Sequence, residues 1–171
     1  MKPPADHLPM IRFLERLSTL CNTWVERTLA AMGITMTCIV VAQVFSRYVL
    51  NASLFWSEEM ARYLLVWLTF LGASCAYYRR VHPGIDIITM RLKGTLKKTC
   101  KIAVHLVSLG FFVVMIYQGS AFAHFIRSQI SPALAIPKWI IFSVIPLSGI
   151  FFLLHCLVFL VAEIAENDHD H

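Results

Sequence analysis

Two histidines lie inside long apolar stretches of the sequence and could act as haem ligands. His105 lies early in the stretch 102–123, and His155 lies deep in the stretch 138–162. If both stretches are antiparallel helices, the two imidazoles reach a similar depth, and such a pair could hold a haem iron for electron transfer. The alternative is that each imidazole forms a hydrogen bond with a neighbouring helix. We favour this alternative, because the apolar stretches contain no further histidine pair for a second haem.

Acidic residues are the second candidates for chemistry, because a carboxylate at membrane depth can bind Na⁺ or relay a proton. The sequence has no acid between Arg27 and Glu58, and Asp86 is the only acid between Glu59 and Glu163. The middle of each long apolar stretch therefore lacks a carboxylate. This distribution argues against an autonomous small exporter, which would need one.

A compact group of charged residues lies at the start of the apolar stretch 60–78. Ser57 is a candidate N-cap, and the partial positive charge of a helix N-terminus favours Glu58 and Glu59 in the first turn. Arg62 follows within one helical turn and could pair with either glutamate. Capping explains the glutamates, but it does not explain so many charges beside lipid. We therefore interpret the following group as a contact with another protein or a neighbouring helix: Arg47, Trp56, Glu58, Glu59 and Arg62.

The cysteines do not have the spacing of a metal site or a disulfide framework. The sequence contains five of them, scattered over separate segments and without a CxxC pair. We interpret them as small apolar residues that fill space between helices. With no catalytic constellation besides, the sequence predicts no metal, no cofactor and no enzymatic activity.

The elements that must position these residues follow from the composition. Hydrophobic residues make up 58% of the 171 residues and charged residues 15%, whereas soluble domains hold about 25% charged residues. The net charge of +5 does not indicate a nucleic-acid partner, because the basic residues flank the apolar stretches and form no single stripe. The chain is therefore predicted to be an integral membrane protein.

Four stretches are long enough to cross a bilayer as helices, which takes about 20 residues for roughly 30 Å of hydrocarbon. They cover residues 28–49, 60–78, 102–123 and 138–162, and none alternates like a strand. The predicted fold is a single all-α membrane domain, residues 1–171, with four transmembrane helices. Pro146 removes a helical hydrogen bond, so we expect a kink between Phe142 and Pro146, where Ser143 or Ser148 can satisfy the freed backbone groups.

The distribution of lysine and arginine predicts the orientation of the spans. Eleven of these residues lie in the N-terminal segment and the connection after the second span, and four lie in the other two connections. The positive-inside rule then places both termini and the connection after the second span in the cytoplasm. Aromatic residues should mark the two membrane surfaces, with Tyr48, Trp56 and Trp139 outside and Trp24, Tyr77 and Tyr78 inside.

Two further segments, 1–27 and 82–100, are amphipathic but too polar to cross the bilayer. Such segments lie flat among the headgroups, where their basic residues meet anionic lipid at the cytoplasmic face. A simple cytoplasmic extension is the alternative. In 1–27 the polar side includes Asn22 and Glu26, and the apolar side carries Ile11, Leu14, Leu17, Cys21, Trp24 and Val25.

Two separated parts of the sequence, 47–86 and 131–149, resemble a known family. The first contains "RYVLNASLFWSEEMARYLLVW" and the second begins "SPALAIPKW". Both are similar to the small membrane subunit (DctQ-like) of tripartite ATP-independent periplasmic (TRAP) transporters. The pairs Tyr77-Tyr78 and Arg79-Arg80 depart from the smaller residues of that pattern. The matching positions include Tyr48, Asn51, Trp67, Gly72, His82, Ser131, Pro132 and Pro137.

The resemblance implies a role without chemistry. In this family a periplasmic binding protein delivers an organic acid to a two-part membrane unit. The large subunit holds the substrate and Na⁺ sites and moves like an elevator, while the small subunit braces it in the bilayer. The haem-binding electron-transfer subunit with His105 and His155 remains the alternative.

Overall fold

The computed structural model describes residues 9–79 and 95–167, with side chains placed within 13–79 and 99–161. These residues form α1 (Pro9–Tyr48), α2 (Phe55–Tyr78), α4 (Thr95–Phe125), α5 (Lys138–Phe142) and α6 (Val144–Asn167). The only strand-like pairing among them is an isolated bridge between Ile130 and Pro137. The predicted all-α fold is confirmed.

Four helical segments within the described ranges are long and apolar enough to cross a membrane. They are Phe13–Tyr48, Phe55–Tyr78, Thr99–Phe125 and Lys138–Val161. Each overlaps one of the four spans predicted from the sequence. The number of spans is therefore confirmed as far as length and composition decide it, and the direction of crossing stays a prediction.

The first helix is longer than predicted. α1 runs for 40 residues without a break, through the expected boundary at Arg27. Its length is about 60 Å at roughly 1.5 Å per residue, which is twice the hydrocarbon thickness. Neither proline nor glycine occurs between Met10 and Gly33, and Thr28 Oγ1 donates to Trp24 O (2.9 Å), so nothing interrupts the helix there. The flat position expected for 1–27 stays a prediction, and residues 1–8 and 82–94 lie outside the described chain.

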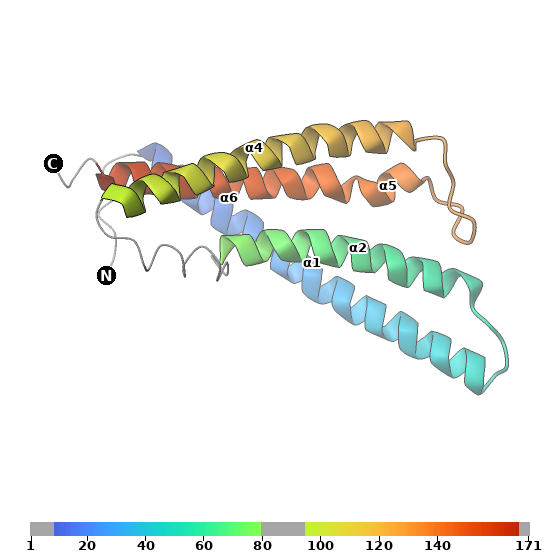
Figure 1. Cartoon of the computed structure of the whole chain (residues 1–171). Helices are drawn as coiled ribbons and strands as arrows, with labels where there is room; N and C mark the ends of the chain where they lie inside the picture. Colours follow the sequence, from blue (N-terminus) through green and yellow to red (C-terminus); the bar gives the residue numbers. More distant parts are fainter. Residues whose placement is uncertain (1–8, 80–94, 168–171) are drawn as a thin grey trace.

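The helices form two antiparallel pairs, α1 with α2 and α4 with α6, and α6 joins the two pairs as the central element (Figure 1). α1 packs against α2, α4 packs against α6, and α6 also contacts both α1 and α2. One buried cluster joins α1, α2 and α6 and consists of Val25, Leu71, Cys75 and Val144. A second joins α2, α4 and α6 and consists of Tyr77, Phe112, Phe152 and Cys156.

Tyr77 belongs to the second cluster and faces the other helices. Its ring meets Phe112 and Phe152 edge-on, at centroid distances of 5.3 and 5.6 Å, while those two rings stack at 4.7 Å. Only 7% of Tyr77 is exposed. Offset and edge-on contacts of this kind are the preferred geometries of aromatic pairs, so Tyr77 stabilises the interior.

The irregularity predicted for the fourth span is present as a one-residue break at Ser143, between α5 and α6. Pro146 has no N–H to donate to Phe142 O, which weakens the helix at this point. Ser143 Oγ donates to Ile140 O (2.6 Å), Ser148 Oγ donates to Ile145 O (2.9 Å), and the Trp67 indole donates to Ile141 O (2.9 Å). Side chains thus supply donors for carbonyls around the break.

Two short connections, 49–54 and 126–137, lie at the same end of the helices (Figure 1). We call this the loop end. The opposite end carries the N-termini of α1 and α4 and the C-termini of α2 and α6, and we call it the terminal end.

Candidate functional site

The Glu59 carboxylate joins α2 to the connection 126–137 at the loop end. Its Oε2 accepts hydrogen bonds from Ala133 N (2.8 Å) and Leu134 N (3.2 Å), and its Oε1 accepts one from the Tyr63 hydroxyl. Ionised acceptors form the stronger hydrogen bonds. The two parts of the sequence that resemble the TRAP family therefore meet at Glu59.

The connection 126–137 needs such support because its backbone is bent tightly. Ala135 adopts φ +52°, a left-handed conformation that costs a non-glycine residue about 1–2 kcal/mol. Ser131 is buried and closes the turn, because Ser131 N donates to Ile136 O (2.9 Å) and Ala135 N donates to Ser131 O (3.1 Å). Pro132 follows it, and Pro137 precedes the first turn of α5 with φ −60°.

The connection 49–54 is bent by Asn51, whose φ is +51°. Asparagine tolerates this left-handed conformation better than most residues. Buried Ser46 ties the turn, since its hydroxyl donates to Ala52 O (2.6 Å) and its carbonyl accepts from Ala52 N (3.1 Å). Tyr48 ends α1 and is 74% exposed.

Ser57 does not cap α2, contrary to the prediction. The helix begins at Phe55, its N-cap residue is Leu54, and no side chain caps it. Ser57 is fully buried, and its hydroxyl donates to Leu54 O (2.7 Å). The N-terminus of α2 is therefore one turn earlier than a capping pattern predicts.

In the structure Glu59 is separated from the other four members of the predicted charge cluster. In the described part of the chain Arg62 forms an ion pair with neither glutamate, and Arg47 also lies exposed without one. Glu58 is exposed and has only a long contact from Gln43 Nε2 (3.4 Å). Trp56 is 41% exposed. Glu59 faces the connection 126–137, whereas the other four side chains remain on the surface.

Three further positions belong to the family resemblance. Trp67 of α2 contacts the region of the break between α5 and α6, because its indole donates a hydrogen bond to Ile141 O. Gly72 lies on α2 with nothing within 4 Å of the place where a Cβ would lie. His82 lies outside the described residues.

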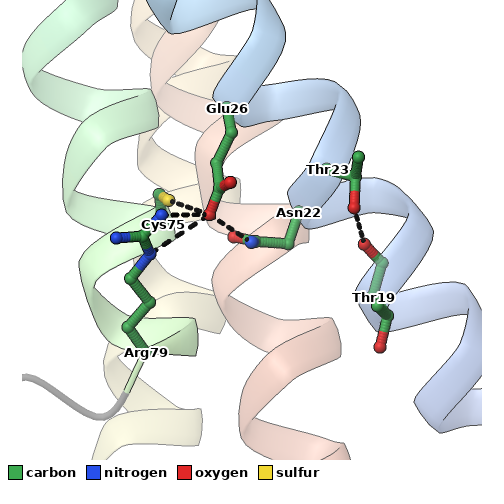
Figure 2. A network of polar contacts seen from close by, with 6 residues as sticks. All are labelled: Thr19, Asn22, Thr23, Glu26, Cys75 and Arg79. Atoms are coloured by element: carbon green, nitrogen blue, oxygen red, sulfur yellow. Dashed lines mark hydrogen bonds and ion pairs between the residues drawn. The ribbon is translucent and has the colours of Figure 1, made fainter.

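A polar network at the terminal end was not predicted from the sequence (Figure 2). Glu26 of α1 directs Oε1 at α2, where it accepts from Arg79 Nη2 (2.8 Å), Arg79 Nε (3.1 Å) and Cys75 Sγ (3.3 Å). Asn22 Nδ2 donates to the same oxygen (2.8 Å). Arg79 lies just beyond α2, and its pKa is raised by these hydrogen bonds to the carboxylate.

The buried side of α1 combines residues from both sides predicted for this segment. Ser18, Asn22 and Val25 are buried against other helices, at 1%, 5% and 6% exposure, while Leu20 and Trp24 are 59% and 66% exposed. Glu15 and Arg16 are exposed as well. Exposed apolar side chains such as Leu20 and Trp24 suit a surrounding lipid phase, in which apolar side chains are well solvated.

Replacing Glu26 by glutamine should lower the melting temperature only slightly, by less than about 3 °C. The Arg79 and Glu26 side chains are 61% and 36% exposed, so solvent screens their attraction. The measurement is thermal unfolding of the purified protein in detergent, at low and high salt. The difference from wild type should shrink at high salt. A large loss that salt does not change would contradict a screened ion pair.

The two histidines contact different neighbours. Buried His155 faces α1, where its Nδ1 lies 2.7 Å from Ser18 Oγ, and its ring lies 5.0 Å from that of Tyr78. His105 lies against Phe159 at a ring distance of 6.4 Å. His155 thus forms the interhelical hydrogen bond that we favoured, and the haem alternative finds no support.

Comparison with known proteins identifies the family. The family model for the DctQ component of tripartite ATP-independent periplasmic transporters matches residues 36–166. The chain belongs to the DctQ family. With four helices able to span a membrane, this DctQ protein is a multi-pass membrane protein and a small permease subunit of the TRAP type.

Two small permease proteins match most of the chain. The sialic acid TRAP transporter protein SiaQ of Vibrio cholerae is 29% identical over 145 residues, which cover 81% of this chain and 80% of SiaQ. The ectoine TRAP transporter protein TeaB of Halomonas elongata is 29% identical over 148 residues, which cover 82% of this chain and 74% of TeaB.

A longer permease contains a similar stretch. The sialic acid TRAP transporter permease SiaT of Haemophilus influenzae is 38% identical over 60 residues, which cover 35% of this chain but only 10% of SiaT. In SiaT, a stretch similar to this DctQ protein is thus part of a much larger polypeptide.

Proposed function

We propose that this DctQ protein is a non-catalytic scaffold subunit that braces the large Na⁺-coupled elevator subunit of a TRAP transporter. Family membership supports the transporter, and the positions of the acids support the passive role. Glu58 and Glu59 lie in the first turns of α2, and Glu26 lies at the terminal end beside Arg79. The long apolar interior has no carboxylate to bind Na⁺ or relay a proton. This absence from the sequence is the observation that carries the proposal.

The cargo of the proposed transporter is an organic acid delivered by a periplasmic binding protein. The names of the relatives specify different solutes, sialic acid for SiaQ and ectoine for TeaB. Small subunits of similar sequence therefore serve different cargoes, which supports a scaffold that does not select the solute.

The proposed orientation places the terminal end in the cytoplasm and the loop end in the periplasm. The excess of lysine and arginine near the terminal end supports it. The connections 49–54 and 126–137 then face the docking binding protein. Glu59 serves this role by holding the backbone of 126–137 in place.

The N-terminal part of α1, which continues the first span without a break, is proposed to reach the cytoplasmic headgroups. Phe13 and Leu20 are exposed there, at 65% and 59%, beside the cationic Arg16. The Arg27 guanidinium lies 5.7 Å from the centre of the Trp24 ring. Apolar side chains flanked by cations bind the surface of anionic lipid.

Reconstitution tests the scaffold role. Vesicles that contain this chain alone should show no sodium-driven uptake above protein-free vesicles. Uptake should require the large permease of the same transporter and the matching binding protein. The same large permease should co-purify with this chain. Sodium-driven uptake by this chain alone would overturn the proposal, and so would full activity of the large permease without it.

A further inference from the structure

One face of α2 lies open on the side turned away from the other helices. Apart from two adjacent small residues, its residues recur every three or four positions along the helix, and none is buried. We call this the α2 outer face, and it consists of Glu58, Arg62, Leu65, Thr69, Gly72, Ala73 and Ala76. α2 contacts α1, α5 and α6 by its other sides.

The end of this face nearest the loop end is charged. Arg62 lies about 10 Å along the helix from Phe55 at roughly 1.5 Å per residue, within the candidate membrane span. In the described residues it has no hydrogen bond and no ion pair. A cation on a transmembrane segment normally pairs with another group or lines a cavity. An anionic partner for Arg62 must therefore come from outside the described residues.

The other residues of the α2 outer face have mostly small side chains. Thr69 turns its hydroxyl back to Leu65 O (2.8 Å), Gly72 has open space around the position of a Cβ, and Ala73 is exposed. Only Leu65 is bulky, with 51% exposure. Small residues let a second helix approach the backbone closely, and close packing drives helix association in lipid.

The exposed side of α4 is different and serves as an internal comparison. It is formed by large apolar side chains, among them Val107 (74% exposed), Phe111 (62%), Val114 (56%) and Phe125 (78%). Side chains of this kind are solvated well by lipid tails. The charged and small α2 outer face is therefore the better candidate for contact with protein.

We infer that the α2 outer face binds a transmembrane helix of the large permease, with an acidic side chain of that helix opposite Arg62. The inference rests on the proposed function and adds the surface through which the scaffold acts. Charge complementarity requires a carboxylate, which a lipid tail cannot supply. In SiaT, a stretch similar to this chain is continuous with a larger permease. This continuity favours the large permease over a second copy of this chain as the occupant.

A matched pair of glycine substitutions tests the inference. Gly72→Leu fills the α2 outer face and Gly110→Leu fills the exposed side of α4, and neither position has an atom within 4 Å of the new Cβ. Both variants should therefore keep the melting temperature of the wild-type chain. In pull-downs on a tagged large permease, Gly72→Leu should reduce co-purification by about tenfold or more, whereas Gly110→Leu should not reduce it. Arg62→Ala should reduce it as well, and Arg62→Lys should retain more.

The possible outcomes distinguish a failure of the inference about the α2 outer face from a failure of the proposed function. If the wild-type chain does not bind the large permease, the proposed function fails. If the wild type binds and Gly72→Leu binds equally well, the function stands and the inference about the α2 outer face is wrong. The inference is also wrong if Gly72→Leu only dissolves a homodimer of this chain while its association with the permease persists.

Discussion

Glu59→Ala is expected to lower the melting temperature by roughly 5 °C and to impair transport. The substitution removes the acceptor for Ala133 N, Leu134 N and the Tyr63 hydroxyl at once. The connection 126–137 then loses its attachment to α2, while Ala135 keeps its left-handed backbone. The measurements are thermal unfolding in detergent and uptake by the reconstituted transporter.

Glu58→Ala is the matched control, because it removes the same charge from the neighbouring position. Glu58 is exposed and accepts only the long contact from Gln43, so its loss should change the melting temperature little. Glu59→Gln should fall between the two, since its single carbonyl oxygen can keep one or two of the three donors. Equal effects of Glu58→Ala and Glu59→Ala would show that both glutamates act only through their charge at the N-terminus of α2, and that the hydrogen bonds of Glu59 to the connection 126–137 do not stabilise the protein.

The role of Glu59 shows what sequence reasoning could reach at this end of the molecule. The sequence drew attention to Glu59 as one of five clustered residues, but the only partner that it suggested for this carboxylate on the same helix was Arg62, within one turn. The actual partners are Tyr63 in the next turn and two backbone amides more than 70 positions away. Helix capping and spacing rules describe one helix at a time. The position of another loop against that helix follows only from how the helices pack.

The N-terminal half of α1 shows a second limit of the same kind. Helical spacing predicted a polar side, with Asn22 and Glu26, and an apolar side, with Trp24 and Val25. In the structure Asn22 and Val25 are both buried, whereas Trp24 is exposed. Asn22 donates to Glu26, and Glu26 accepts from Arg79. Which residues of α1 are buried depends on the positions of α2 and α6, and helical spacing within one segment does not give these positions.

The fold itself was largely predictable, for a physical reason. Spans of about 20 apolar residues have few alternatives to a helix in lipid, because every backbone group needs an internal partner. Pro146 marked the break in the fourth span for the same reason, through the hydrogen bond that it cannot form. The order in which the four spans pack is not encoded by hydropathy, and α6 as the central element was not foreseen.

Gly119→Val is expected to destabilise the protein by about 3 kcal/mol, the upper end of the usual penalty for overpacking. α4 passes α6 closely at this point. A Cβ at position 119 would lie 2.9 Å from Ile145 Cγ2, 3.0 Å from Pro146 Cδ and 3.1 Å from Pro146 N. The proline ring and backbone cannot turn away as a long side chain can. The two helices must therefore separate, and thermal unfolding in detergent should report the loss.

Gly110→Val on the same helix is the control, because its Cβ would meet nothing within 4 Å. Gly149→Val is the intermediate case. Its Cβ would come within 2.7 Å of Ile116 Cγ1 and 3.1 Å of Met115 Cε, which are both side-chain atoms, whereas two of the three close atoms at Gly119 belong to the ring and backbone of Pro146. The expected order of melting temperatures is Gly110→Val highest, Gly149→Val intermediate and Gly119→Val lowest. Equal melting of Gly119→Val and Gly110→Val would mean that α4 and α6 do not approach each other closely at Pro146.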